Sequence, residues 1–311
     1  MNRLFRDVEG GLLCPQGSVA CIGAFDGLHL GHQALLRHAA GRARALGVPL
    51  VALGFEPLPR EVFAHPVPAR LMLPRPKVCG LFEAGADLVG LLRFDAKFAA
   101  MSAESFVREL LVERLQVREV WVGPDFHFGS KRGGDLATLH RLGRSRGFEA
   151  GEIAPVSIDG ERVSSTRIRA ALAAGDLVLA ARLLGRPYAI GGHVLHGSEL
   201  GRKLGFPTAN LRFDRKRPPL SGIFAARVHG VGEAPWPAVA SFGTRPTVDG
   251  QEPLLEAHLF DFDGDLYGRR IEVEFVAKLR EETKFDDLPA LVAQMTVDAA
   301  QARAILDKET Q

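Results

Sequence analysis

The spacing of apolar residues divides the chain into a first part of alternating strands and helices and a second part of short strands. In the first part, short apolar runs alternate with segments of helical period, which is typical of parallel strands joined by helices. The predicted strands are residues 19–22, 50–55, 88–92 and 119–122. We therefore predict an α/β domain with a parallel sheet.

Capping residues indicate where helices of this first part begin and end. Ser102 precedes a segment whose apolar residues share one side, namely Phe106, Leu110, Leu111 and Leu115. A later helix is predicted to begin near Ser165 or Thr166 and to stop at Gly175, and a short helix to end at Gly185, because glycine suits the left-handed residue after a helix.

The pattern changes after Gly185-Arg186-Pro187, where helical period nearly disappears and turns containing Gly and Pro separate short runs. Helical period returns only within residues 288–305, which predicts one or two terminal helices. We therefore predict domains 1–186 and 187–311, the second being a small antiparallel barrel or sandwich closed by those helices. Its predicted strands include residues 222–228, 254–260 and 271–275.

Composition and charge narrow the class of protein. Hydrophobic residues make up 46% and charged residues 24%, as in soluble globular proteins. The net charge is only +2, and the Lys and Arg residues are distributed along the chain among nearly as many acidic residues, which argues against nucleic acid as the main partner. Residues 1–20 lack the apolar core of a signal peptide, and no run approaches a membrane span. Cys14, Cys21 and Cys79 show no CxxC spacing, which favours reduced thiols. We expect a cytoplasmic protein without a membrane partner.

The strongest chemical signal is a turn that contains several glycines between a predicted strand and a helix. It reads Gly23-Ala24-Phe25-Asp26-Gly27-Leu28-His29-Leu30-Gly31-His32. Backbone N–H groups in such a turn approach a polyphosphate, the helix N-terminus adds partial positive charge, and two imidazoles donate hydrogen bonds as charge develops. This chemistry suits adenylyl transfer. The alternatives are a plain turn with surface histidines, and a zinc ion shared by His29 and His32, for which no third ligand is spaced nearby.

A second candidate site lies between Gly197 and Asn210. Neither GxxxxGK[ST] nor GxGxxG occurs in the sequence, so a phosphoryl transferase would hold ATP in another way. The segment Gly201-Arg202-Lys203-Leu204-Gly205-Phe206-Pro207-Thr208-Ala209-Asn210 offers a flexible glycine arch, two cations, and Thr and Asn oxygens that suit Mg²⁺. Taken alone, the segment is equally consistent with a solvated loop.

The turn of the first part resembles the HxGH pattern of the nucleotidyltransferase superfamily. Its longer form, GxFDGxHxGH, is similar to the bacterial bifunctional riboflavin kinase/FMN adenylyltransferase family. Residues 55–63 and 123–129 resemble loops of that family, and residues 162–169 resemble the SSTxIR signature. The resemblance implies a Rossmann-like nucleotidyltransferase domain in which the FMN phosphate attacks the α-phosphorus of MgATP in line.

The same resemblance implies roles for individual residues of the first part. His29, His32 and Arg169 would be catalytic. Asp125 stands where the family often has Asn. The residues implied to bind ATP for adenylyl transfer are Gly23, Phe25, Asp26, Gly31, Asp125, Arg162, Ser165 and Thr166.

The second part resembles riboflavin kinases in its GRxLGFPTAN segment, in residues 243–247 (GxRPT) and in residues 256–268 (ExHLxDF followed by LYG). Glu256 would be the general base for the ribityl 5′-hydroxyl. Phe224 and Ser241-Phe242 depart from the family pattern, and we interpret His196 as structural. The remaining implied roles are Mg²⁺ and ATP binding by Thr208 and Asn210, ATP binding by Gly201, Lys203 and Gly205, and flavin binding by Arg245 and Tyr267.

The sequence therefore predicts a bifunctional enzyme of FAD biosynthesis. It would convert riboflavin and ATP to FMN and ADP, and then FMN and ATP to FAD and pyrophosphate. Mg²⁺ is the expected cofactor, ATP the co-substrate, and riboflavin, FMN and FAD the other ligands; whether the chain forms a homo-oligomer is left open. One alternative is a monofunctional FMN adenylyltransferase whose barrel binds flavin without kinase activity. The other is a flavin- or nucleotide-sensing regulator without turnover.

Overall fold

In a computed structural model, contacts divide the chain into two compact units, which we call the N-terminal unit and the C-terminal unit. The first comprises Met1–Pro68 and Met72–Ser165, and the second Ala69–Leu71 and Thr166–Gln311. The contact boundary thus falls earlier than residue 186, and the predicted domain boundary stays a prediction. The structure describes residues 3–197, 200–212, 217–247 and 250–308, without the side chains of 200, 203, 212, 244–247 and 250–252.

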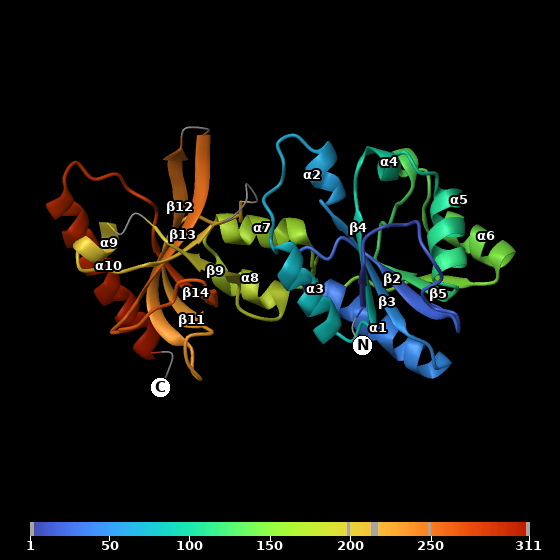
Figure 1. Ribbon diagram of the computed structural model, residues 1–311, viewed down its shortest axis with the longest axis horizontal. Coiled ribbons are helices and arrows are strands. Elements are labelled where there is room, and N and C mark those ends of the chain that lie inside the picture. Colours follow the sequence, from blue (N-terminus) through green and yellow to red (C-terminus); the bar gives the residue numbers. More distant parts are fainter. Residues whose placement is uncertain (1–2, 198–199, 213–216, 248–249, 309–311) are drawn as a thin grey trace. The chain divides into compact units, whose positions relative to one another are not determined.

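The N-terminal unit is built on a six-stranded parallel sheet with the strand order β1-β4-β3-β2-β5-β6 (Figure 1). The strands are β1 (Arg3–Phe5), β2 (Ser18–Ile22), β3 (Leu50–Glu56), β4 (Leu88–Arg93), β5 (Val117–Val122) and β6 (Glu149–Glu152). The predicted parallel α/β fold is confirmed, and the four predicted strands are β2 to β5. The edge strands β1 and β6 were not predicted because they are short and lack apolar alternation.

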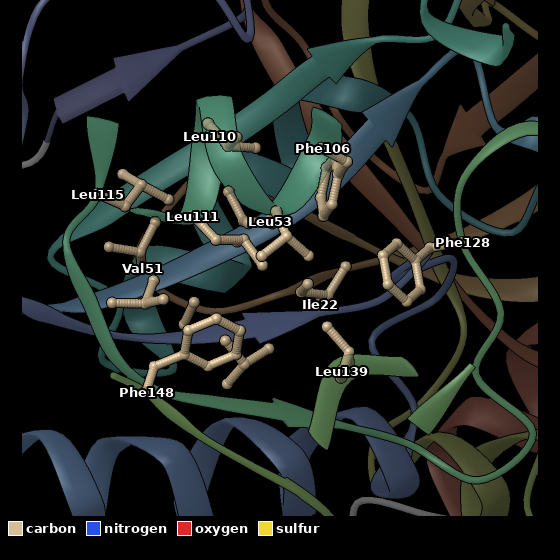
Figure 2. Close-up of a cluster of buried hydrophobic side chains, with 14 of the residues drawn as sticks. Ile22, Val51, Leu53, Phe106, Leu110, Leu111, Leu115, Phe128, Leu139 and Phe148 are labelled. Carbon is tan, nitrogen blue, oxygen red and sulfur yellow. The ribbon is translucent and has the colours of Figure 1, made fainter. Parts of the chain in front are cut away.

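Side chains of the central strands alternate between two apolar cores on opposite faces of the sheet. Ala20 and Ile22 belong to one core, whereas Val19 and Cys21 belong to the other, which also receives residues of α1 and α3. Figure 2 shows the first core, in which Ile22 lies among side chains that include Leu53, Phe106 and Phe148. Because both faces are buried, the central strands are continuous apolar runs.

Helices of the N-terminal unit follow the predicted positions, with one difference in winding. Ser102 caps α5 as predicted, since its Oγ accepts a hydrogen bond from the N–H of Ser105 at 3.0 Å. From Val107 onward, however, this segment continues as a π-helix. The helices are α1 (Leu30–Leu46), α2 (Pro59–Phe63), α3 (Pro74–Glu83), α4 (Ala96–Ala99), α5 (Ala103–Phe106), η1 (Val107–Arg114), the 3₁₀ turn η2 (Ser130–Arg132) and α6 (Leu136–Arg146). A small hairpin joins β7 (Ser157–Ile158) to β8 (Glu161–Arg162).

The C-terminal unit contains a closed antiparallel barrel with the order β10-β13-β12-β11-β14-β9. Pairing of β9 with β10 closes it, which decides between the barrel and the sandwich. Its strands are β9 (Ala189–Leu195), β10 (Ala209–Arg212), β11 (Gly222–His229), β12 (Trp236–Thr247), β13 (Gly250–Leu259) and β14 (Arg270–Arg280). The helices are α7 (Ser165–Ala173), α8 (Leu177–Leu184), α9 (Leu200–Lys203) and α10 (Leu288–Lys308).

One long terminal helix covers part of the outside of this barrel. Ala302 and Leu306 of α10 form a small apolar core with Ala225 and Phe260. The predicted helix end at Gly185 is confirmed, because Gly185 is the left-handed C-cap of α8. In the described ranges, no helix combines the length and apolar character that crossing a membrane requires.

A buried carboxylate ties β5 to α1 in the N-terminal unit. Glu119 is 3% exposed and accepts hydrogen bonds from Arg42 at 2.9 Å and from Trp121 at 2.8 Å. The hydrogen bond from Arg42 holds the pKa of Glu119 below its ordinary value. Because the folded-state pKa is lowered, the stabilisation is complete above the unfolded value of about 4.3 and is lost as the pH falls through the folded value.

We expect Glu119→Gln to lower the Tm of the N-terminal unit by about 4 °C at pH 7, because it removes a buried charged partner. The difference in Tm between wild type and Glu119→Gln should be smaller at pH 4, because the ionised Glu119 carboxylate then contributes less to the stability of the wild type. Thermal unfolding at the two pH values measures this, with Glu152→Gln, at an exposed position of β6, as the matched control. Equal Tm values for wild type and Glu119→Gln at pH 7 would contradict the expectation.

Candidate active sites

The turn between β2 and α1 brings the two predicted histidines together. His29 is the N-cap of α1, and its Nδ1 accepts a hydrogen bond from the backbone N–H of His32 at 3.3 Å. The two rings stack with centroids 3.7 Å apart and an interplanar angle of 17°. Gly31 leaves room for this arrangement, since a Cβ at Gly31 would lie 3.2 Å from the His29 ring.

Phe25 and Asp26 are buried beneath this turn and pack against it, so neither side chain is exposed to solvent. Phe25 has a positive φ of 51°, its ring is fully buried, and its centroid lies 5.3 Å from that of His32. Gly23 lies against the Phe25 ring, which a Cβ there would approach to 3.2 Å. The Asp26 carboxylate accepts a hydrogen bond from the Met72 N–H at 3.2 Å, and its carbonyl accepts one from the Ser165 hydroxyl at 2.9 Å. The predicted residues Gly23, Phe25, Asp26 and Ser165 therefore share one region with the histidines.

Burial and nearby positive groups act on His32. The pKa of His32 lies well below its ordinary value, first because burial disfavours the charged ring and then because His29, Lys77 and Arg60 oppose a further positive charge. The His32 residue is partly exposed, yet its Nδ1 is covered and has no hydrogen-bond partner among the described residues. Sequence reasoning missed Lys77 and Arg60, because a cation on a helix is usually a surface residue.

An exposed ion pair joins the loop after β5 to strand β8, both of which carry a residue that was predicted to bind ATP. Arg162 donates one hydrogen bond to the Asp125 carboxylate at 2.5 Å and another to the Pro124 carbonyl at 3.0 Å. Asp125 has a positive φ of 60°, which Asp tolerates better than most residues. Exposed pairs of this kind are weak.

Thr166 and Arg169, the other predicted residues of the adenylyl site, belong by their contacts to the C-terminal unit. Within that unit, Nε of Arg169 donates a hydrogen bond to the Ala69 carbonyl at 2.6 Å. Their roles in adenylyl transfer stay predictions.

Sequence reasoning also missed an aromatic cluster at the carboxyl ends of β3 and β4. The Phe94 ring makes edge contacts with Phe55 and Phe63 at centroid distances of 5.9 and 5.8 Å, and it also packs on Phe98. Phe63 on α2 is 65% exposed. An exposed aromatic ring at this edge of a parallel sheet suits a flat ligand. The available signal was a group of phenylalanines directly after two predicted strands.

The C-terminal unit contains a cavity of 260 Å³ bounded by β10, β12, β13 and α10. Four predicted kinase residues line it, namely Gly201, Thr208, Asn210 and Glu256. Glu256 of β13 pairs in register with Asn210 of β10 and with Ser241 of β12, so it occupies the middle of three strands. The Oδ1 of Asn210 is buried and has no hydrogen-bond partner in the described structure.

Three further charged residues line this cavity and were not predicted. Arg280 donates hydrogen bonds to both carboxylate oxygens of Asp298 on α10, at 2.9 and 2.7 Å, and so ties β14 to α10. Burial raises the pKa of Glu282. The Glu282 carboxylate fills the place of a side chain at Gly243, because a Cβ there would lie 1.8 Å from it. These contacts depend on tertiary packing, which the local pattern does not reveal.

Other predicted kinase residues lie apart from the cavity or outside the described side chains. Tyr267 does not line the cavity; its ring stacks on His196 with centroids 3.7 Å apart. Gly205 has a positive φ of 85° and lies in the loop between two lining residues. The side chains of Lys203 and Arg245 lie outside the described residues. Among residues with described positions, no group of three or more His, Cys, Asp or Glu could hold a metal ion.

Comparison with known proteins gives two family matches in the order of the two units. The FAD synthetase profile matches residues 13–167, and the riboflavin kinase profile matches residues 184–306. A crystal structure from Streptococcus pneumoniae, described as a macrolide-efflux protein, is similar over 96% of this chain and 97% of that one, with a TM-score of 0.80 and 31% identity. The fold of both units is therefore shared with a solved structure.

Two curated relatives are similar over nearly the whole length. The bifunctional riboflavin kinase/FMN adenylyltransferase of Escherichia coli strain K12 is 45% identical over 303 residues, which cover 97% of each chain. The protein of the same name from Pseudomonas fluorescens is 49% identical over 292 residues, which cover 93% of each chain. With both profiles matched and this identity over nearly the whole length, the chain belongs to the bifunctional riboflavin kinase/FMN adenylyltransferase family and is a bifunctional FAD synthetase.

Proposed function

We propose that the N-terminal unit transfers the adenylyl group of ATP to FMN, whereas residues 187–311 phosphorylate riboflavin. The observation that supports this division is that two groups of candidate catalytic residues lie in different units. The stacked His29 and His32 lie at the start of α1 in the N-terminal unit. Glu256 and Asn210 share a cavity in the C-terminal unit.

In adenylyl transfer, an FMN phosphate oxygen would attack the α-phosphorus of ATP, and pyrophosphate would leave from the opposite side. His29 and His32 would donate hydrogen bonds to the α-phosphate as its charge grows, assisted by the N-terminus of α1. Gly23 and Gly31 would let the backbone approach the nucleotide. Within the N-terminal unit, the outgoing phosphates and the nucleoside would be held by Asp125, Arg162 and Ser165, whereas the roles that the family resemblance implies for Thr166 and Arg169 stay predictions. Arg162 would exchange Asp125 for phosphate on binding.

The aromatic cluster of Phe55, Phe63, Phe94 and Phe98 would bind the isoalloxazine ring of FMN. Phe63 and Phe94 present ring faces and edges next to the ends of β3 and β4, and Phe63 is mostly exposed. An isoalloxazine ring that packs there would bury apolar area that the free enzyme leaves in water.

In the kinase reaction, Glu256 would take the proton of the ribityl 5′-hydroxyl while the hydroxyl oxygen attacks the γ-phosphorus of ATP, and ADP would leave. Thr208 and Asn210 fit a hard cation, because the orphaned Oδ1 of Asn210 is an oxygen donor that lacks a protein partner in the described structure. Mg²⁺, when bound there, would neutralise charge on the phosphate oxygens. The loop of Gly201, Lys203 and Gly205 would cradle ATP. Arg245 and Tyr267 would contact the flavin, Tyr267 from outside the cavity.

The cysteines fit the proposed cytoplasmic location. Cys14 and Cys21 are buried and Cys79 is exposed, and all three are free thiols. Burial raises the pKa of Cys21 to about 12, so this thiol stays protonated and unreactive.

Incubation of the full chain with riboflavin and MgATP tests the proposed function. We expect FMN to appear first and FAD to follow, both resolved by chromatography. FAD formed only from supplied FMN would favour the monofunctional alternative. Binding of flavin without either product would favour the sensing alternative.

A further inference from the structure

Lys77 is a lysine with no exposed surface inside the N-terminal unit. Its Nζ donates a long hydrogen bond of 3.5 Å to the carbonyl of Phe55, near the end of β3. Removing an ammonium group from water is costly, so lysines are rarely buried completely. A buried cation beside a catalytic turn is therefore a candidate functional residue.

The helix that carries Lys77 packs directly against the histidine turn. Leu81 of α3 shares an apolar core with Phe25 and Leu28 of the turn. Gly80 lies so close to Leu28 that a Cβ at Gly80 would be 2.5 Å from Leu28 Cδ1. Lys77 and Gly80 are three positions apart and so lie on one face of α3. The face that bears Lys77 is thus the face that meets the turn.

The surroundings of His32 accommodate an uncharged ring. The His29 ring stacks on it, and its covered Nδ1 has no hydrogen-bond partner among the described residues. A charged imidazole carries a proton on both nitrogens, so protonation would bury an unsatisfied N–H at Nδ1. In the neutral ring with Nδ1 unprotonated, the proton lies on Nε2, which can donate a hydrogen bond.

We propose that Lys77 is a positioning residue for adenylyl transfer, whose buried ammonium keeps His32 uncharged and able to donate a hydrogen bond from Nε2 to the α-phosphate. The inference rests on the proposed role of His32. Among the residues that the structure describes, the charged and titratable groups that act on His32 are His29 at its own turn, Arg60 of α2 and Lys77 of α3.

The test compares wild type with Lys77→Met in the full chain, measuring FAD formation from FMN and MgATP across pH 5 to 9. We expect the rate to fall by roughly tenfold, the scale seen when a group that supports a catalytic side chain is lost. The acid limb of the pH profile should move upward by about half a pH unit or more, because His32 becomes easier to protonate. Riboflavin kinase turnover of the same chain should be unchanged.

Control variants separate this role from a structural one. Lys97→Met removes a lysine that is 79% exposed, and it should leave the rate and the acid limb unchanged. Lys77→Arg keeps the charge and should restore the acid limb. In a His32→Asn background, Lys77→Met should cause no further loss, because Lys77 acts through His32.

Two results would overturn the proposal. One is an unshifted acid limb in Lys77→Met, or in Lys77→Gln if the Met variant fails to fold. The other is an equal loss from Lys77→Met with and without His32. If His32→Asn alone keeps the wild-type rate of FAD formation, the proposed role of His32 fails instead, which is a separate outcome.

Discussion

Replacing Glu256 by glutamine is expected to lower FMN formation from riboflavin by about a thousandfold. The substitution keeps the shape of the side chain in the cavity but removes the group that would accept the hydroxyl proton. FAD formation from supplied FMN should continue at the wild-type rate, because the stacked histidines belong to the other unit. Chromatographic separation of FMN and FAD over time measures both rates in one preparation.

Glu272→Gln is the matched control for this experiment. Glu272 lies at an exposed position of β14 and does not line the cavity. It should retain both activities. Equal loss of both activities in a folded Glu256→Gln protein would show that Glu256 does not serve the kinase reaction alone.

Replacing His29 by alanine is expected to stop the reaction at FMN. The variant loses an imidazole that would bind the α-phosphate, the N-cap of α1 and the ring that stacks on His32. We expect FAD formation to fall by about a hundredfold or more. FMN should accumulate from riboflavin and MgATP at the wild-type rate.

His140→Ala provides the comparison for His29→Ala, because His140 is an exposed residue of α6 in the same unit. It should still form FAD. If His29→Ala makes FAD as fast as wild type, adenylyl transfer does not use the histidine turn, and the proposed division of labour is wrong.

Elements with a strong local pattern could be predicted from the sequence. The strands β2 to β4 consist almost entirely of buried apolar residues. Ser102 marks a helix start through its side-chain hydrogen bond, and Gly185 marks a helix end through its left-handed backbone. The histidine turn could be predicted because all of its glycine and histidine residues lie within one short segment, residues 23–32. The same holds for the segment from Gly201 to Asn210.

Features that depend on which surfaces meet could not be predicted. In the sequence, Lys77 looks like an ordinary surface lysine of a helix. It is buried only because α3 packs against the histidine turn. Arg280 and Asp298 are distant in sequence from Glu256, yet β14 brings Arg280 and α10 brings Asp298 to the same cavity. The segment is π-helical from Val107, yet the predicted apolar residues Phe106, Leu110, Leu111 and Leu115 are buried as they would be in an α-helix, so the apolar pattern does not reveal this winding.

The lengths of the edge strands bear on self-association of the folded chain. Unpaired strand edges are templates for pairing with another molecule. In the parallel sheet the edge strands β1 and β6 have 3 and 4 residues, whereas the four inner strands have 5 to 7. The barrel is closed by β9 and β10 and leaves no edge in its described ring of strands. The sheets described here thus offer a second copy little backbone on which β-aggregation could begin.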